Sequence, residues 1–359
     1  MNKVLTVGLI AVFCLITGLS YAADVAVDHT GSRVAAGYMS DESACPTFGV
    51  ADAKLKLNAK VDANTSAVLR IDAPTMTLDY AFVKLDNVVS QLVPNLPINP
   101  SITVGKFKID FGEETYSNNP VEGALVYNSR ANVSGNDNGV MFKQEDFLKN
   151  LPLILGCSLS FMNGTCALVD NNTNKAFNFK ATGQMKTQPL YFSLSYYSAT
   201  GIPCTVVQDA PLASTYDGVA VNWSQKAFEL SARFDLLEGA AKFEPAKAPL
   251  YSDSKGVFTL AYGTVTTGEP VVGKTTTGYV ALGALYNVDA KLYVAFRYSY
   301  NDFAVDRAAA FDAKTTRIQI GGGYKVSGNT TLKFEYTMDG EPSPAIDDNK
   351  VSLIVCTLW

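Results

Sequence analysis

The feature that most constrains the fold of this chain is an alternation of apolar with polar or small residues, repeated in one short segment after another. In the C-terminal third, apolar residues take every second position of residues 228–235, 292–300, 317–326 and 331–338, apart from a glycine at position 322. Successive side chains of a β-strand point to opposite sides of its sheet, so a period of two indicates strands with one apolar and one polar face. The chain is therefore predicted to be all-β.

The connections between these segments also alternate in length. Tight turns are expected at residues 287–290 and 327–329, whereas longer loops rich in Asp, Pro and Gly are expected at 302–314 and 339–349. Short turns at one end and long loops at the other are typical of barrels in the bacterial outer membrane. Residues 351–359 fit the same plan, because they place Val, Leu and Val on one parity and end in Trp.

The N-terminal segment predicts export from the cytoplasm. A positive charge at Lys3 and an almost continuous apolar run over residues 4–19 precede Ala22, a small residue at a cleavage position. The alternative is a membrane anchor, but a run of about 16 residues is short for a span, which needs about 20. We therefore expect residues 1–22 to be a signal peptide and residues 23–359 to form a single outer-membrane β-barrel.

Chain length sets the expected size of the barrel. About 337 residues after cleavage, at roughly 21 residues per strand and connection, give a transmembrane antiparallel β-barrel of about 16 strands, with 14 and 18 as alternatives. A barrel of this size leaves a water-filled lumen. The competing fold is a soluble β-sandwich, whose strands alternate in the same way. The barrel is favoured because the apolar face continues across consecutive hairpins and because tyrosines cluster near strand ends, as an interfacial girdle would.

Some stretches do not fit the pattern. Residues 78–86 change parity, which indicates a β-bulge or a strand end near Val83. Residues 87–100 and 236–251 could be loops or could each hide a strand. Counted back from the C-terminus, strand direction becomes inconsistent over residues 256–276, so one element there is miscounted.

The polar face carries more positive than negative charge, although the whole chain has a net charge of −5. On the clear strands twelve basic residues stand against five acidic ones. The basic residues are Lys54, Lys56, Lys60, Arg70, Lys106, Lys108, Lys180, Arg233, Arg297, Arg317, Lys325 and Lys333. The acidic residues are Asp72, Asp110, Glu229, Asp235 and Glu335. We expect this face to line the pore, with the balancing carboxylates in loops such as 339–341 and 347–348. A basic wall favours anions in transit; the alternative is that Lys and Arg side chains near the rims bind the phosphates of lipopolysaccharide.

One strand leads into a long polar stretch that could narrow the pore. Residues 104–114 read Val-Gly-Lys-Phe-Lys-Ile-Asp-Phe-Gly-Glu-Glu, and residues without alternation follow as far as Asn138. The alternation predicts that Phe107, Ile109 and Phe111 face lipid while the intervening charged residues face the lumen.

This arrangement resembles the inward-folded constriction loop of general porins, and the Gly-Lys-Phe-Lys…Phe-Gly run resembles the corresponding strand of phosphate-selective bacterial porins. At the level of motifs the resemblance covers residues 55–142. It implies that Glu113, Glu114 and Glu122 face Arg130 and the wall lysines across the narrowest point, where opposed charges create a transverse field and limit solute size. A mobile external loop is the alternative.

Three classes of function are compared. A passive diffusion porin, with no cofactor and no catalytic residue, is the leading interpretation, and small hydrophilic solutes would cross it with a weak anion preference. An outer-membrane enzyme would need a histidine held beside a nucleophile, yet the single histidine, His29, lies outside the strand pattern. A surface adhesin or a structural barrel with a blocked lumen is the alternative that the sequence leaves open. No glycine loop or basic cluster predicts nucleotide or nucleic-acid binding.

Cysteine usage predicts no metal site. Five cysteines remain after cleavage, namely Cys45, Cys157, Cys166, Cys204 and Cys356, and an odd count means that at least one is free or pairs between chains. Two of Cys45, Cys166 and Cys204 could form a loop disulfide, because all three lie in turn-like surroundings, whereas Cys356 is expected to stay unpaired in its strand. No Cys-x-x-Cys spacing or histidine partner is present.

The expected partners follow from the compartment. Outer-membrane lipid and lipopolysaccharide would surround the barrel. The resemblance to porins implies folding by the barrel-assembly machinery, which reads C-terminal strands such as Lys350–Trp359, and assembly into homotrimers, the common state of barrels of this size.

Overall fold

The computed structural model describes fourteen stretches of the chain. These are residues 26–41, 44–93, 98–114, 119–129, 133–148, 151–164, 175–200, 206–207, 224–239, 242–244, 247–269, 273–305, 313–340 and 349–359. The predicted signal peptide, Arg130, Cys166 and Cys204 lie outside the described residues, as does the side chain of Cys45. Within the described stretches, no helix has the length and apolar character needed to cross a membrane.

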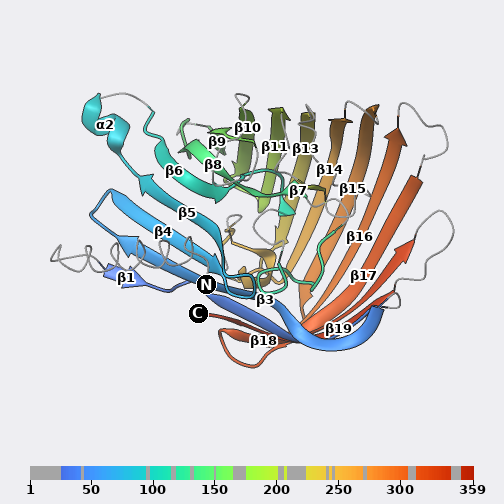
Figure 1. Ribbon diagram of the computed structural model, residues 1–359. Helices are drawn as coiled ribbons and strands as arrows, with labels where there is room; N and C mark the ends of the chain where they lie inside the picture. The colour runs from blue at the N-terminus through green and yellow to red at the C-terminus, as the bar shows by residue number, and fades with distance from the viewer. Residues whose placement is uncertain are drawn as a thin grey trace.

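Sixteen antiparallel strands form a closed barrel, as the alternation predicted (Figure 1). In chain order they are β2 (Arg33–Asp41), β3 (Ala44–Lys60), β4 (Thr65–Asp72), β5 (Thr77–Leu85), β6 (Ser101–Lys108), β8 (Asn136–Gln144), β9 (Leu153–Met162), β10 (Ala176–Met185), β11 (Leu190–Thr200), β13 (Ser224–Leu236), β14 (Gly256–Glu269), β15 (Gly273–Asn287), β16 (Leu292–Val305), β17 (Ala313–Lys325), β18 (Thr330–Gly340) and β19 (Lys350–Leu358). Each strand pairs with the next, and β19 pairs with β2 to close the ring.

Shorter elements complete the chain. Strand β1 (Ala26–Asp28) pairs with the end of β3, and β7 (Val133–Ser134) pairs with β12 (Val206–Val207) apart from the barrel. The α-helix α2 (Val88–Leu92) lies between β5 and β6, and the 3-10 helix η2 (Pro249–Tyr251) lies between β13 and β14.

The two faces of the wall have opposite chemistry in the C-terminal half. Phe296, Phe334 and Leu353 are 44%, 51% and 47% exposed on the outer face. Their chain neighbours Glu335 and Ser352 are fully buried on the inner face. Side chains of adjacent strands therefore form an apolar outer band and a polar inner surface, which is the sidedness that the alternation predicted.

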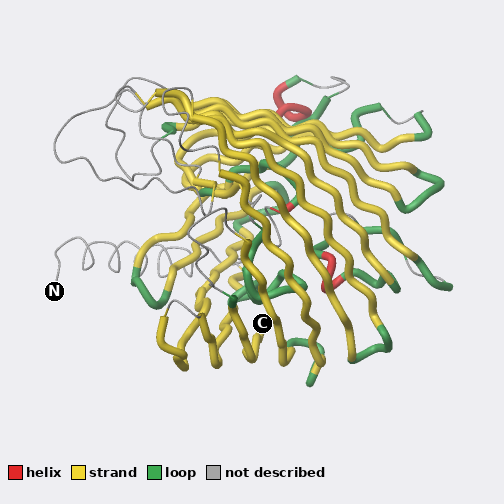
Figure 2. Tube along the Cα trace, turned by 90° about the vertical axis from the view of Figure 1, so that its right-hand side faces the viewer, coloured by secondary structure: helices red, strands yellow, loops and turns green. Residues whose placement is uncertain are grey.

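The start of β2 and the end of β19 meet at one end of the barrel, which we call the terminal end. The Gly31 amide donates to the Trp359 carbonyl at 2.7 Å, and the Trp359 amide donates to the Ser32 carbonyl at 2.9 Å. The tight turns between β15 and β16 and between β17 and β18 lie at the same end. The opposite end of the wall, at which β11, β16 and β18 end, we call the loop end; Figure 2 shows the strands of the wall lying side by side between the two ends.

Several connections depart from the expected rule of short turns at one end and long loops at the other, and the one between β13 and β14 explains the inconsistent strand direction. Leu236 and Gly256 are directly paired, so residues 237–255 form a long connection at the terminal end. The next two strands are close in sequence, because β14 ends at Glu269 and β15 begins at Gly273. The expectation of short turns at one end and long loops at the other is therefore wrong here, and residues 256–276 form one hairpin that the count had misplaced.

The predicted break near Val83 lies four positions earlier in the strand. Ile71 pairs with Leu78 and Arg70 pairs with Tyr80, so Asp79 is the extra residue of a β-bulge. Beyond the bulge Val83 faces outward and is 41% exposed, while Tyr80 is buried on the inner face. The bulge directs the Asp79 carboxylate inward, where it accepts a hydrogen bond from Arg70 at 2.6 Å.

Candidate pore and constriction loop

Strand β6 ends by turning into the barrel. Its pairing with β5 runs only as far as Lys106, which faces Ala81. Beyond this point Phe107, Ile109 and Phe111 are at most 1% exposed and pack together inside the barrel. The wall side chains that receive them are Met162, Ala176, Tyr197, Ala199, Ala227, Val265 and Tyr279.

The sidedness predicted for this segment is therefore wrong. Phe107 lies inside rather than against lipid, and Lys106 shares its parity with Val104, which is 44% exposed on the outer face. Lys106 directs its ammonium to the Leu78 carbonyl at 3.0 Å. Lys108, at the end of the strand, lies within electrostatic range of Glu122 inside the barrel. Once the chain leaves the wall, both of its faces are interior, so apolar parity no longer marks the lipid side.

The described residues that follow β6, namely 109–114 and 119–129, lie inside the barrel and are called the constriction loop here. The Lys333 ammonium on β18 donates to three of its carbonyls, those of Pro120, Val121 and Gly123, at 2.7, 3.1 and 2.6 Å. The Tyr293 hydroxyl donates to the Ala124 carbonyl at 3.1 Å. A single buried cation therefore fixes the turn of the loop, because ammonium-to-carbonyl bonds in a water-poor site are strong.

A second group of contacts fixes the return of the loop. The Glu335 carboxylate accepts hydrogen bonds from the Val126 and Tyr127 amides. The Tyr127 carbonyl in turn accepts from Arg297 at 3.1 Å and from Gln319 at 2.9 Å. The constriction loop therefore contacts the inner face of four consecutive strands, β16 to β19, when the Ser352–Tyr127 hydroxyl contact at 3.1 Å is included.

The three acidic residues expected in a constriction have different environments. Glu114 forms an ion pair with Arg297 at 2.9 Å, and Glu122 forms one with Arg33 at 2.8 Å. The wall partners are thus arginines rather than the expected lysines. Among the described residues, no group pairs with the carboxylate of Glu113, although its amide donates to Glu229 at 2.8 Å. Arg130, the fourth expected member, lies outside the described residues.

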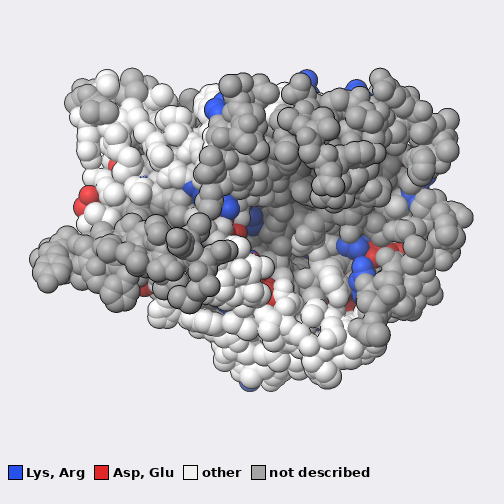
Figure 3. Space-filling model, viewed as in Figure 1, with Lys and Arg blue, Asp and Glu red and all other residues white. Residues whose placement is uncertain are grey.

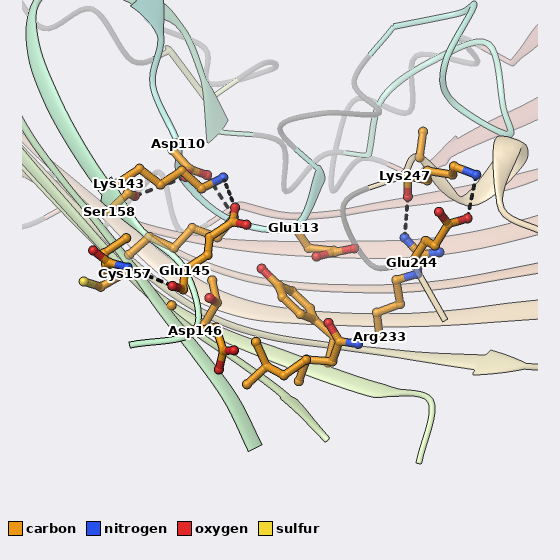
Figure 4. A pocket seen from close by; sticks show the side chains of 18 of the residues that line it. Asp110, Glu113, Lys143, Glu145, Asp146, Cys157, Ser158, Arg233, Glu244 and Lys247 are labelled. Atoms are coloured by element: carbon orange, nitrogen blue, oxygen red, sulfur yellow. Dashed lines mark hydrogen bonds and ion pairs between the residues drawn. The ribbon is translucent and has the colours of Figure 1, made fainter. Parts of the chain in front are cut away.

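Glu113 borders a cavity of about 500 Å³ between the constriction loop and the β8–β11 wall (Figure 4). Cations that border the same cavity are already paired: Lys180 lies 3.1 Å from Asp110, and Arg233 lies 2.7 Å from Asp235. Removal from bulk water raises the pKa of the Glu113 side chain, in the loop, to about 7. Glu113 is therefore the loop carboxylate whose charge changes near neutral pH.

The inner wall is more nearly neutral than the sequence count predicted. Asp52 pairs with Arg33 at 2.5 Å, and Asp339 pairs with Arg317 at 2.6 Å. The Lys54 ammonium contacts the Asp72 carboxylate. The expectation that Asp339 balances charge in a loop is wrong, because it ends β18 on the inner face. The sequence count omitted Asp52 and Asp339, although the alternation could have placed both on the inner face. Asp52 lies two positions before Lys54, and Asp339 lies four positions after Glu335.

Charged groups of both signs are visible in the hollow of the molecule. The face turned to the viewer in Figure 3 is hollowed at its centre, and Lys, Arg, Asp and Glu atoms line the hollow. Some of the tyrosines expected at a lipid interface lie inside instead: Tyr197, Tyr279 and Tyr293 are at most 1% exposed. In the described part of the chain, no cluster of histidine, cysteine and carboxylate residues could hold a metal ion, and Cys157 and Cys356 are free.

Comparison with solved structures places this fold among general outer-membrane porins. The chain matches the outer-membrane expressed OmpT of Vibrio cholerae with a TM-score of 0.62 and 12% identity, over 93% of this chain and 98% of that chain. It matches the outer membrane channel DcaP of Acinetobacter baumannii with a TM-score of 0.60 and 12% identity, over 94% and 98%. It matches the anion-selective porin from Comamonas acidovorans with a TM-score of 0.55 and 13% identity, over 94% and 100%.

These similarities concern the fold. No protein-family model matches the sequence, and no curated protein sequence is detectably similar to it. The chain therefore has the all-β, closed, 16-stranded architecture of porins without detectable sequence relationship to a described family.

Proposed function

We propose that this chain is a porin of the bacterial outer membrane, exported through a signal peptide formed by residues 1–22. Small hydrophilic solutes would diffuse through its lumen down their gradients. The observation that carries this proposal is the opposite chemistry of the two barrel faces, apolar at Phe334 and charged at Glu335. A cylinder with an oily exterior and a hydrated, charged interior lets polar solutes cross a membrane.

Single-channel recording tests the proposal. The chain without residues 1–22 is refolded, its closed barrel is verified by an unheated gel shift, and it is added to a planar bilayer. Stepwise increases in current are expected. A folded barrel that gives no steps above the detergent blank would contradict the porin and favour an adhesin or a structural barrel with a blocked lumen, which the packing of the constriction loop against Leu250 and Tyr293 also permits.

We also propose a weak anion preference. Its support is the set of wall cations without a carboxylate partner among the described residues: Lys56 has none, and Lys333 is held by carbonyls. Lys56→Glu is expected to shift the reversal potential in a salt gradient toward cations, because it reverses a charge inside a low-dielectric wall that focuses the field. Lys291→Glu, in an exposed tight turn, is the matched control. Clear cation selectivity of the unaltered protein would contradict the preference.

The solute class is open to a direct assay. Liposome-swelling rates measured with a series of sugars and phosphates distinguish a general pore from a phosphate-selective one. The motif at residues 104–112 resembles the phosphate-selective type. Rates that fall only with solute size favour a general pore. A rate for phosphate far above that of sugars of equal size favours the phosphate-selective type.

The partners proposed are outer-membrane lipid, lipopolysaccharide, the barrel-assembly machinery and a homotrimer of this chain. One solved structure matched by this chain is described as a trimer form of OmpT. Deleting Trp359 is expected to impair assembly, because the terminal aromatic residue belongs to the strand that the machinery would read. Trp359→Phe, which keeps an aromatic ring, is the control. Normal membrane levels of the truncated chain would contradict this role.

A further inference from the structure

The connection between β13 and β14 does more than join two strands. Leu236 and Gly256 are directly paired in register, so a two-residue hairpin turn would suffice to connect them. The chain instead inserts residues 237–255 at the terminal end, where the neighbouring connections are tight turns. We call the described residues 247–255 the inner segment.

The inner segment is held on the inner face of the barrel. The Arg233 guanidinium donates to the Lys247 carbonyl at 2.6 Å, and the Ser254 hydroxyl donates to the Asp235 carboxylate at 2.6 Å. Leu250 is fully buried. Arg233 and Asp235 are wall residues of β13, so their contacts direct the inner segment into the lumen rather than away from the rim.

The inner segment meets the constriction loop inside the barrel. The Tyr251 hydroxyl donates to the Val121 carbonyl at 3.1 Å. Leu250 packs in a buried cluster with Leu125 of the constriction loop and Tyr293 of the wall. Two segments that enter from opposite ends of the barrel are thus joined by one hydrogen bond and one apolar contact.

The cavity of about 500 Å³ lies beside this junction. Glu113 of the constriction loop and Lys247, Ala248 and Pro249 of the inner segment border it, and the β8–β11 wall closes the other side (Figure 4). The constriction loop and the inner segment pack toward β14–β16, where Leu125 and Leu250 share one buried apolar cluster with Tyr293. Among the described residues, the cavity of about 500 Å³ lies on the opposite side of this junction, along β8–β11.

We propose that the inner segment is a second constriction element, which joins the constriction loop and confines solutes to the cavity along β8–β11. This inference rests on the proposed porin function. Pore width is then set by two segments. The Lys247 ammonium pairs with the Glu244 carboxylate at 2.5 Å at the edge of the cavity, so this pair contributes to the charge that solutes meet on the terminal-end side.

Removing the inner segment tests the width. Residues 237–255 are replaced by Asn-Gly, which fits a two-residue turn between paired strands. Single-channel conductance is expected to rise at least about twofold, because the open cross-section of the pore grows. A folded variant with unchanged conductance, beside a conducting unaltered protein, would overturn the second constriction.

A charge reversal keeps the test decisive if the shortened variant does not fold. Lys247→Glu is expected to shift the reversal potential in a tenfold salt gradient toward cations. Lys255→Glu is the matched control, because Lys255 carries the same charge in the same segment but contacts the Val288 carbonyl and the Tyr286 ring, away from the cavity. Equal shifts in both variants, or none in either, would overturn the inference.

The outcomes separate the two proposals. An unaltered protein without channel steps contradicts the porin itself. If that silent protein conducts once residues 237–255 are replaced, the inner segment is an occluding element and its place in the lumen is supported. If both proteins conduct equally, the porin stands and the second constriction falls.

Discussion

Two regions of this molecule use the same residue types in opposite ways. In β18, Phe334 is exposed on the outer face and Lys333 is buried within the barrel. In and after β6, Phe107 and Phe111 are buried within the barrel, while Lys106 shares the parity of the exposed Val104. The two segments look alike in sequence, since both alternate large apolar residues with lysine.

The difference between β18 and β6 shows that alternation identifies a strand but does not say which face meets lipid. A period of two identifies a strand, but the identity of the apolar side depends on what each face meets. A strand of the wall separates lipid from a polar interior, so its apolar face is external. A strand that leaves the wall has interior on both faces, and its apolar residues then pack where a second apolar surface is available, here around Tyr197 and Tyr279.

The largest expected effect is on stability, and it is tested by making the same Phe→Ala substitution in both regions. Phe111→Ala is expected to lower the free energy of unfolding by about 3 to 5 kcal/mol, because it leaves a void in close-packed protein. Phe334→Ala leaves space that lipid or detergent fills, so its effect is expected to be several times smaller. Urea titrations of both refolded variants compare the two. Equal losses would contradict the assignment of Phe111 to the interior.

A charge on the outer face sharpens the same contrast. Phe334→Lys is expected to cost about 2 to 4 kcal/mol, the range for a lysine near the middle of the bilayer. Asn329→Lys, in the exposed turn before the same strand, is the control and is expected to be nearly neutral. Folded fractions in lipid vesicles over a urea series measure both. A neutral Phe334→Lys would mean that this face does not meet lipid.

The anchor of the constriction loop gives the next prediction. Lys333→Met removes three hydrogen bonds to loop carbonyls, and each bond to a charged group contributes about 1.5 to 3 kcal/mol. Removing the buried ammonium also removes its desolvation cost, which partly offsets the lost hydrogen bonds. The barrel is therefore expected to stay folded, while the constriction loop becomes more mobile. Faster proteolysis within residues 119–129 and noisier single-channel current are the readouts. Lys325→Met, at the end of β17, is the control and is expected to change neither.

The smallest effect concerns pH. Because the pKa of Glu113 is raised to about 7, its carboxylate is charged at pH 8 and largely neutral at pH 6. Lowering the pH across this range removes a negative charge from the cavity, so the reversal potential is expected to move toward anions. Glu113→Gln should behave at pH 8 as the unaltered protein does at pH 6 and should lose the shift. If the reversal potential of Glu113→Gln still changes between pH 8 and pH 6, a group other than Glu113 is responsible for the pH dependence.

Much of the wall could be predicted from sequence because its two faces meet two different solvents. The strands over residues 292–300, 317–326 and 331–338 and the number of strands follow from parity and length alone. The bulge at Asp79 could not be located, since Tyr80 and Phe82 are as apolar as a lipid-facing pair would be. Only the pairing with Arg70 distinguishes the two registers.

The interior was harder to predict because its contacts join residues far apart in sequence. Glu122 and Arg33, or Lys333 and the turn at Pro120, meet only when the loop crosses the lumen, and no local pattern encodes that meeting. The sequence left residues 236–251 open as a loop or a hidden strand, and the placement of the inner segment depends on the hydrogen bond from Tyr251 to the Val121 carbonyl. Local periodicity therefore predicts the wall and leaves the contents of the lumen undetermined.

The seam between β19 and β2 has a consequence for how the molecule forms. It pairs Lys350 with Asp41, so the last ladder joins the two strands of the ring that are most distant along the chain. Until it forms, the sheet is an open ribbon with two rows of unpaired amides and carbonyls, which attract other extended chains. Pairing of strands that are distant in sequence is slow, and unpaired strand edges are prone to aggregation and strand exchange. An assembly factor would therefore have to protect the edges of β2 and β19 until the last step of folding.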